Sequence, residues 1–399
     1  MRALQYRFSP AAWLAARYVA PRVPALAVAV SGLRLQEVPR PVPPTPDWVR
    51  VRVRLSGICG TDIAMLRGKT GPELSPFVSF PAVPGHEVLG VVQEGALAGR
   101  RVVLDPFLGC LPRGLAPCPA CAAGQTTLCE RFAEGTLAPG MLIGVCRDLP
   151  GGWSEELVAH RSQLYPVPDN VDDGLAVLAE PLAVALHPIL TAPPTPGERV
   201  LVIGAGTVGL CAVAACRMQR PDARVVAVAR HPAQRRLAAA LGAAYVVPDI
   251  PAAGRLAADR GWRRIYAGLL GRSAGTGGYD RVVDAVGSSV SLSAALQLVR
   301  AGGRVDLLGC SGVLSDIDLT WLWAHEIELN GFCGYGPEAS AGGRHTIAVA
   351  LELLGYPGGA QLAGLVTHRF PLVEYRQALR AAFFHRRSGA IKVLFAMDA

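Results

Sequence analysis

The sequence is poor in charged and aromatic residues and contains no long apolar run. Charged residues make up 18% and aromatic residues 6% of the 399 positions, whereas 51% are hydrophobic. A disordered chain has the opposite balance, and a transmembrane helix needs about 20 consecutive apolar residues. We therefore expect a globular protein with large buried cores, long enough for two or three domains.

Lysine is almost absent, since Lys69 and Lys392 are the only two, and the formal net charge of +8 comes almost wholly from arginine. The arginines are scattered along the chain and form no polybasic block. This distribution argues against a nucleic-acid or membrane partner and is compatible with an anionic small molecule as ligand.

Two features bear on the cellular compartment. The apolar segment 25–30 (ALAVAV) contains a pattern found in secretory signals, but we expect it to form one of two short strands on either side of Ser31 and Gly32. The ten cysteines of this long chain do not resemble a secreted disulfide scaffold, and four of them crowd together. We expect no export and a cytoplasmic protein.

The composition and the hydrophobic pattern of the chain change along its length. Residues 1–180 are rich in valine, proline and glycine, with alternating runs such as VRVRVRL that indicate half-buried strands and a mainly β domain. Residues 181–335 alternate apolar strands with alanine-rich helices, which is typical of a doubly wound parallel sheet. Residues 336–399 are expected to return to the first domain, with helices near 348–354 and 375–384 and a strand at 391–395. The fold class is therefore α/β with two domains, and its parallel strands are expected at 199–203, 224–228, 281–286 and 304–308.

A glycine-rich turn follows the first of these strands. VLVI runs into GAGTVG and then into an apolar helical segment, as the dinucleotide-binding fingerprint requires. Gly204 allows the tight turn, Gly206 lets a pyrophosphate approach the backbone, and Gly209 lets helix and strand pack closely. The first helical residues, Thr207 and Val208, present free N–H groups to phosphates. The alternative is a turn with only a structural role.

The end of the second strand bears on the choice of cofactor. An acidic residue there would bind the ribose diol of NAD, but the chain has Ala229 followed by Arg230. Arg230, helped by His231 or Arg235, could pair with the 2′-phosphate of NADP. NADP is therefore favoured over NAD, with a solvated arginine and indifferent cofactor use as the alternative.

Two short motifs carry candidate metal ligands. GICGTD contributes Cys59, and PGHE contributes His86 and Glu87. A thiolate, an imidazole and a carboxylate are the ligands of a catalytic zinc with one open position. Glu180, at a helix start, could ligate the metal directly or through water in alternation with Glu87, while Asp62 and Glu87 could instead orient His86. For His86 alone, a buried core histidine is the alternative.

A second group of thiols has the spacing C-x7-C-x2-C-x7-C. Four thiolates without a histidine form a closed tetrahedral zinc site, so we expect a structural role. The alternative is an iron–sulfur cluster, but the spacing matches no common motif of that kind. Its members are Cys110, Cys118, Cys121 and Cys129. The other cysteines are expected to be small core residues, namely Cys146, Cys211, Cys216, Cys310 and Cys333.

Taken in order, these motifs resemble the medium-chain zinc alcohol dehydrogenases, particularly the sorbitol and threonine dehydrogenase branch. The resemblance runs from LRLQEVPRPVPP through GICGTD, PGHE, the cysteine cluster, AEPLAVALH, VLVIGAGTVGL and DAVG to GAIKVLF, nearly the whole chain. It implies a GroES-like catalytic domain with two zincs, a Rossmann domain, and an active site between them. It also implies that Cys59 and His86 ligate zinc, with Glu87 or Glu180, and that Thr61 takes the proton of the alcohol. Members of this branch are commonly tetramers or dimers.

The chain departs from the family pattern at three places. Seven residues separate Cys110 from Cys118, where the family has two, so Cys110 reaches the metal only if this loop folds back. The histidine that many relatives carry three residues after Thr61 is Ala64 here. An extra segment at 9–24 has no role that its residues indicate.

The function implied is zinc-dependent hydride transfer between a secondary alcohol or polyol, or the matching ketone, and NAD(P). One alternative is an NADPH-dependent reductase of C=C bonds on the same fold. Another is a zinc-ribbon binding module, which leaves the glycine turn unexplained. Aromatic residues that could line the substrate pocket or belong to the core are Phe107, Trp321 and Trp323.

Overall fold

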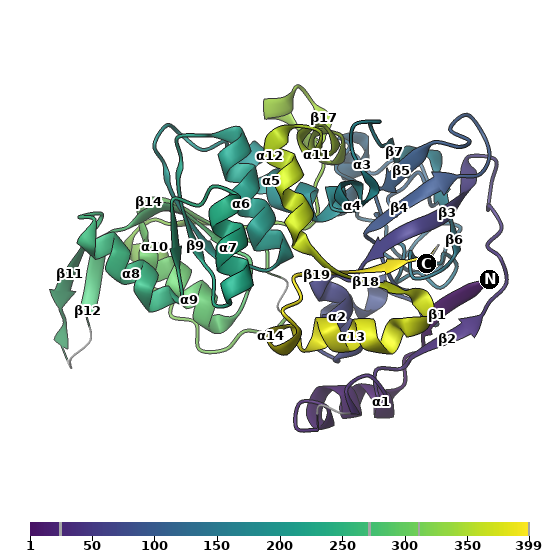
Figure 1. Cartoon of the computed structure of the whole chain (residues 1–399), viewed down its shortest axis with the longest axis horizontal. Coiled ribbons are helices and arrows are strands. Elements are labelled where there is room, and N and C mark those ends of the chain that lie inside the picture. Colours follow the sequence, from purple (N-terminus) through teal and green to yellow (C-terminus); the bar gives the residue numbers. More distant parts are fainter. Residues whose placement is uncertain (24–25, 270–272, 310–311, 398–399) are drawn as a thin grey trace.

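The computed structural model describes residues 1–23, 26–269, 273–309 and 312–397, and two large sheets divide it into two lobes (Figure 1). One lobe holds most of the first 166 residues together with the C-terminal strands, and the other holds the parallel sheet. Helix α5 (Ala179–Thr191) lies between them and is buried along most of its length, as expected of a helix that is apolar on nearly every side. Among the described residues, no helix is both long and apolar enough to cross a membrane.

The β lobe is built on a seven-stranded sheet with the order β18-β19-β3-β4-β5-β7, and β6 also pairs with β3. The long strand β3 contains the alternating VRVRVRL run, and its Val51, Val53 and Leu55 are buried. The strands are β3 (Trp48–Gly57), β4 (Val88–Val92), β5 (Arg101–Leu104), β6 (Glu156–His160), β7 (Leu164–Pro166), β18 (Val366–Pro371) and β19 (Lys392–Ala396).

The C-terminal segment returns to this sheet, and β19 lies between β18 and β3 (Figure 1). Two helices precede it, α13 (Tyr375–Phe383) and α14 (His385–Ser388). The expected strand at 391–395 and helix at 375–384 therefore exist, each displaced by one residue at one or both ends.

The other lobe is a six-stranded parallel sheet with the order β10-β9-β8-β13-β14-β15. This is the order of the dinucleotide-binding fold, in which the strand sequence reverses at β8 and leaves a crevice at its carboxyl end. The strands are β8 (Arg199–Ile203), β9 (Arg224–Val228), β10 (Tyr245–Val247), β13 (Tyr279–Asp284), β14 (Val299–Leu307) and β15 (Glu328–Gly331). Its helices are α6 (Thr207–Gln219), α7 (Pro232–Ala240), α8 (Ile250–Asp259) and α9 (Ser289–Leu298).

Two of the expected parallel strands begin earlier than the apolar pattern suggests. The predicted 281–286 is β13 from Tyr279, and the predicted 304–308 is β14 from Val299. Tyr279 is buried and its hydroxyl donates to the carbonyl of Ala253 at 2.9 Å, so this polar-tipped side chain belongs to the core of the sheet.

Two local expectations are wrong, namely the strand at 25–30 and the burial of Cys333. No strand covers the described part of 25–30, because Ser31 Oγ donates to the carbonyl of Val28 at 2.7 Å and closes a turn. The strand that does form, β2 (Leu33–Glu37), pairs instead with β1 (Arg2–Tyr6). Cys333 is exposed rather than a core residue, whereas Cys146, Cys211 and Cys216 are buried and Cys310 lies outside the described residues.

Two segments extend beyond the lobes. The N-terminal segment forms α1 (Pro10–Leu14) and the π-helical turn Ala15–Val19, where Arg17 donates to the carbonyl of Gly68 at 2.7 Å. An isolated hairpin of β11 (Arg263–Ala267) and β12 (Ser273–Gly277) projects from the parallel-sheet lobe (Figure 1). The remaining helices are α2 (Gly60–Leu66), α3 (Pro119–Ala122), α4 (Asp173–Ala176), α10 (Thr320–Ala324), α11 (Thr346–Leu354) and α12 (Pro357–Ala360).

Candidate functional site

Cys59 and His86 are positioned by one carboxylate. Cys59 caps α2, and its backbone N–H donates to Asp62 Oδ2 at 2.9 Å, while Asp62 Oδ1 lies 3.5 Å from His86 Nδ1. Burial acts to lower the pKa of His86, but the negative charges of Asp62 and Cys59 outweigh it and raise that pKa well above its usual range. A metal bound at His86 would displace this proton. Thr61 lies exposed on the first turn of the same helix.

The structure brings Cys59, His86 and Glu87 together, with their possible ligand atoms all within 4.8 Å of one another. His86 and Glu87 are buried, and Cys59 is partly exposed. Sulfur, nitrogen and oxygen donors at this spacing fit a catalytic zinc site that has access to solvent.

Glu87, however, already has a partner for both oxygens. Lys392 Nζ lies 2.7 Å from Oε1 and 2.6 Å from Oε2, and it also donates to the carbonyl of Ile58 at 3.2 Å. Both side chains are only 2% exposed. A Cβ on Gly57 would stand 1.7 Å from Glu87 Oε2, so only glycine leaves room for this pair. The geometry thus favours Glu87 as a fixed negative charge beside the donors over direct ligation.

Glu180 is the other carboxylate expected near the metal. It lies in the first turn of α5, is 7% exposed, and accepts a hydrogen bond from the hydroxyl of Tyr335 at 3.4 Å. Burial raises the pKa of Glu180 to about 7, and the nearby charges of His86 and Lys392 act in the opposite direction. The charges of His86, Glu87 and Lys392 thus act on Glu180, but Glu180 is not among the residues whose ligand atoms lie within 4.8 Å of one another.

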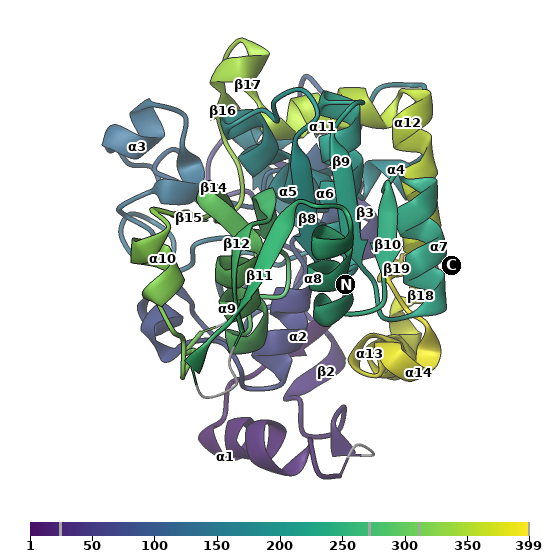
Figure 2. The same ribbon diagram turned by 90° about the vertical axis from the view of Figure 1, so that its left-hand side faces the viewer.

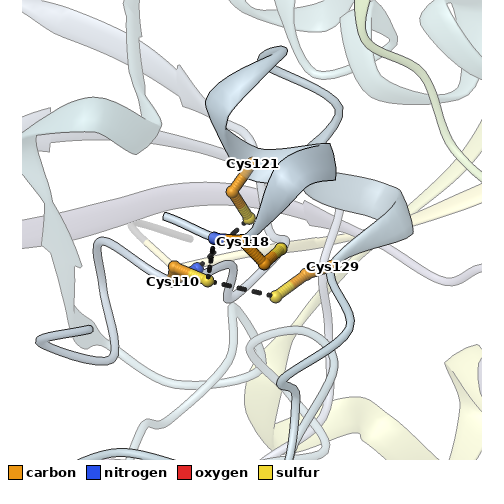
Figure 3. Close-up of side chains that lie close together, drawn as sticks. All are labelled: Cys110, Cys118, Cys121 and Cys129. Carbon is orange, nitrogen blue, oxygen red and sulfur yellow. Dashed lines mark hydrogen bonds between the residues drawn. The ribbon is translucent and has the colours of Figure 1, made fainter. Parts of the chain in front are cut away.

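The four clustered thiols converge in one place (Figure 3), with their sulfur atoms within 4.8 Å of one another. Backbone N–H groups of Cys118 and Arg131 donate to the sulfurs of Cys110 and Cys129, each at 3.3 Å. Hydrogen bonds from the backbone N–H groups of Glu130 and Cys121 lower the pKa of Cys118 to about 6. At Cys129 burial outweighs the hydrogen bond from Arg131 and raises the pKa to about 11, so a metal bound there would have to displace a proton. The donor set fits a closed tetrahedral zinc site.

Cys110 reaches this cluster because the lengthened loop folds back around Arg113. The Arg113 side chain is fully buried, and its guanidinium donates only to backbone carbonyls. The acceptors, at 2.5 to 3.2 Å, are the carbonyls of Leu108, Glu134, Leu137, Ala138 and Gly140. The sequence interpretation missed Arg113, because nothing local distinguishes it from the many other arginines.

The glycine turn has the geometry its sequence predicts. Gly204 has a φ of +98°, and a Cβ on Gly209 would stand 1.7 Å from the carbonyl oxygen of Gly204. A Cβ on Gly206 would meet nothing within 4 Å, so open space lies over the turn where a pyrophosphate could sit. Val208 follows at the start of α6, partly buried.

This turn is tied to the metal-ligand cluster by two adjacent residues. Thr207 Oγ1 donates to the carbonyl of Ile391 at 3.1 Å, and the next residue, Lys392, holds Glu87. The nucleotide turn of one lobe and the donor cluster of the other therefore meet at the start of β19. Lys392 was not predicted as a site residue, and its only signal is that it is one of two lysines.

The residues expected at the ribose lie together where β9 ends. Ala229 is fully buried, Arg230 is exposed, and His231 caps α7, with Arg235 partly buried on the first turn of that helix.

The three aromatic residues considered for the substrate pocket differ in burial. Phe107 is buried and packs edge-to-face on Tyr335 with 5.9 Å between ring centroids, so it supports the residue that contacts Glu180. Trp321 is partly buried, and Trp323 is 74% exposed and outside the core.

Comparisons with known proteins agree with this arrangement. The family profile described as "Alcohol dehydrogenase GroES-like domain" matches residues 45–169, and the one described as "Zinc-binding dehydrogenase" matches residues 207–372. The chain is 32% identical to an L-galactonate-5-dehydrogenase of Escherichia coli K12 over 266 residues, 65% of this chain and 68% of that protein. It is 28% identical to a sorbitol dehydrogenase of Arabidopsis thaliana over 356 residues, 88% of each.

Solved structures share the whole fold. An alcohol dehydrogenase of E. coli CFT073, complexed with NADH, superimposes with a TM-score of 0.75 at 23% identity over 100% of this chain and 99% of that one. An alcohol dehydrogenase of Thermus sp. ATN1 gives a TM-score of 0.71 at 25% identity over 99% of both chains.

These findings argue against the zinc-ribbon binding module, because they support a zinc-binding dehydrogenase that acts on CH–OH groups. With the GroES-like and parallel-sheet lobes both in place, the chain belongs to the zinc-dependent medium-chain alcohol dehydrogenase family.

Proposed function

We propose that this enzyme transfers a hydride between a secondary alcohol, of a polyol or sugar acid, and NADP. The observation that carries the proposal is the pair Ile391 and Lys392, which links the glycine turn at Thr207 to the carboxylate beside Cys59 and His86. A nicotinamide cofactor bound along that turn would have its reactive ring on the side of the donor cluster.

We assign two zincs to the chain. Cys59, His86 and Glu180 would hold the catalytic one, with Glu87 retained by Lys392 as a nearby negative charge. The structural one would be held by Cys110, Cys118, Cys121 and Cys129. When bound at the first site, zinc supplies Lewis acidity, which makes an alcohol oxygen easier to deprotonate.

The protein groups around this site then have separate tasks. Asp62 keeps His86 in one orientation, and burial of Glu180 and Glu87 excludes water from the reacting side. Thr61 accepts the proton of the alcohol at its hydroxyl. Because Ala64 replaces the histidine of many relatives and Thr61 is exposed, the proton passes from Thr61 directly to solvent.

The substrate class follows from the relatives and the site. The relatives are named for galactonate and sorbitol, both of which carry secondary hydroxyls. NADP is favoured because Ala229 offers no acceptor for the ribose diol and Arg230 is exposed beside it. We further propose a cytoplasmic homo-oligomer, a dimer or tetramer, in which the clustered thiols stay reduced.

The direct test measures initial rates with a panel of secondary alcohols, polyols and sugar acids, using NADP and NAD, before and after chelation. Activity should be lost on chelation and return with zinc. Cys59→Ser should lower kcat by at least about a thousandfold, since a metal ligand is lost, and leave the dissociation constant of NADPH nearly unchanged.

Cys146→Ser is the matched control, because Cys146 is buried outside the cluster and its sulfur donates only to the carbonyl of Ala138. Wild-type turnover by Cys59→Ser would contradict the zinc mechanism. Reduction of conjugated C=C bonds, with no alcohol oxidised by zinc-loaded protein, would replace the proposal by the reductase alternative.

A further inference from the structure

The inference rests on the proposed use of NADP and concerns how its 2′-phosphate is bound. We propose that this phosphate is held from two sides. One side is the end of β9, with Arg230 and His231. The other is α14, with His385 and Arg386, a helix that belongs to the β lobe and not to the parallel sheet.

The two sides already lie against each other. The rings of His231 and His385 are 6.3 Å apart between centroids and nearly perpendicular, at 81°. Figure 1 shows α14 beside α7, and Figure 2 shows it below α7. The chain after α14 continues onto the glycine turn, because Thr207 donates to the carbonyl of Ile391 at 3.1 Å. Residues 385–391 therefore run along the edge of the nucleotide site.

The charged groups that act on His385 are all basic. Besides His231, they are Arg386 and Arg67, and their charges lower the pKa of His385 after the larger effect of burial. Arg67 is fixed in place: it donates to the carbonyl of Phe383 at 2.8 Å and its guanidinium lies 4.7 Å from the centroid of that ring.

No carboxylate balances this group. Within the described ranges, none of the side chains of Arg230, His231, His385 and Arg386 lies within ion-pair distance of an aspartate or glutamate. Among the described residues, the two arginines of this group have no counter-ion, so an anion bound beside them gains the attraction of each. A phosphate monoester suits the position, because the 2′ oxygen of the adenosine ribose lies at the end of the second strand of this fold.

Holding the phosphate from both lobes has two consequences. The 2′-phosphate of bound NADP then links the parallel-sheet lobe to the β lobe. NAD lacks this phosphate and can link the lobes only through the parts of the molecule that it shares with NADP. Phosphate binding also favours the charged form of His385, whose pKa is lowered in the free protein, so the preference for NADPH over NADH should decrease as pH rises and that charge is lost.

The experiment measures dissociation constants of NADPH and NADH by fluorescence titration on zinc-loaded protein. Arg386→Ala and His385→Gln should each weaken NADPH binding by about tenfold, the usual effect of losing a charge-assisted hydrogen bond, and change NADH binding by less than about twofold. Arg230→Ala should have the same selectivity. Arg387→Ala is the matched control: it removes the same charge from the same helix, but Arg387, unlike Arg386, is not among the charges that act on His385.

The outcomes separate the two ideas. If wild type prefers NADPH and Arg230→Ala removes this preference but Arg386→Ala and His385→Gln do not, the role of α14 is overturned and the use of NADP stands. If Arg387→Ala weakened NADPH binding by the same factor, the role of α14 would also be overturned, because the effect would then come from the overall positive charge of the protein. If wild type binds NADPH and NADH equally, both the clamp and the NADP preference fail, while zinc-dependent oxidation with NAD would still support the dehydrogenase function.

Discussion

The Lys392–Glu87 pair shows how a single buried contact can hold a reactive site together. Two opposite charges this deep in the protein gain from each other, but each has lost its hydration, so removing one partner is far worse than removing both. Gly57 leaves space for the carboxylate and the carbonyl of Ile58 takes a further ammonium proton, so the pair has one permitted arrangement.

This asymmetry gives a test at the residue scale. Lys392→Met should destabilise the protein by about 3–5 kcal/mol, because it leaves Glu87 buried and unpaired. The double variant Lys392→Met with Glu87→Gln should recover most of that loss. Denaturant unfolding of the metal-loaded protein measures both values, and a double variant no more stable than the single one would contradict the pairing.

Among the elements, the loop between Cys110 and Cys118 shows how an insertion can keep a metal site intact. Five added residues would separate the first sulfur from the others unless the loop returned upon itself. Arg113 makes that return possible, since its five N–H donors match a ring of carbonyls that no helix or strand satisfies. Its positive charge also lies close to thiolates that carry negative charge when a metal is bound.

Arg113→Met should therefore disorder the cysteine loop. Several buried carbonyls would lose their donor, and the free energy of unfolding should fall by about 3 kcal/mol or more. Zinc content should drop from two per chain toward one. Arg131→Ala is the control in the same lobe, because its exposed pair with Glu134 contributes about 1 kcal/mol or less. Two retained zincs in Arg113→Met would refute this role.

The elements that could be predicted from sequence are those with a local signal. The strand–glycine–helix unit around Gly204 and the alternating β3 needed only periodicity and turn chemistry. The turn at 26–30 was missed because its apolar residues pack against other parts of the β lobe, and periodicity does not distinguish such a turn from a strand. Lys392, Arg113 and His385 act through contacts with residues far away in the sequence, which no spacing rule reveals.

For the molecule as a whole, the proposed metal ligands and the glycine turn lie in different lobes. Every proposed metal ligand lies in the β lobe or at the start of α5, whereas the glycine turn belongs to the parallel sheet. Removing both metals with a strong chelator should lower the melting temperature by at least about 5 °C, because bound metal stabilises only the folded state.

In the same metal-free sample, titration should still detect NADPH binding with little loss of affinity, since no metal ligand lies on the glycine turn. Zinc added back should restore the melting temperature and turnover together. If the metal-free protein no longer bound NADPH, cofactor binding in the parallel-sheet lobe would depend on the metals of the β lobe, which would contradict this prediction.

The position of β19 also affects how the protein is made. This strand lies inside the seven-stranded sheet, between β18 and β3, yet it is synthesised after every other strand of that sheet. The parallel sheet can assemble while translation continues, as earlier parts of a chain often do. The sheet of the β lobe stays incomplete between β18 and β3 until Lys392 and its neighbours have been synthesised. A message that ended before the codon for Lys392 would therefore yield a protein with a folded nucleotide lobe, an incomplete sheet and no buried cation for Glu87.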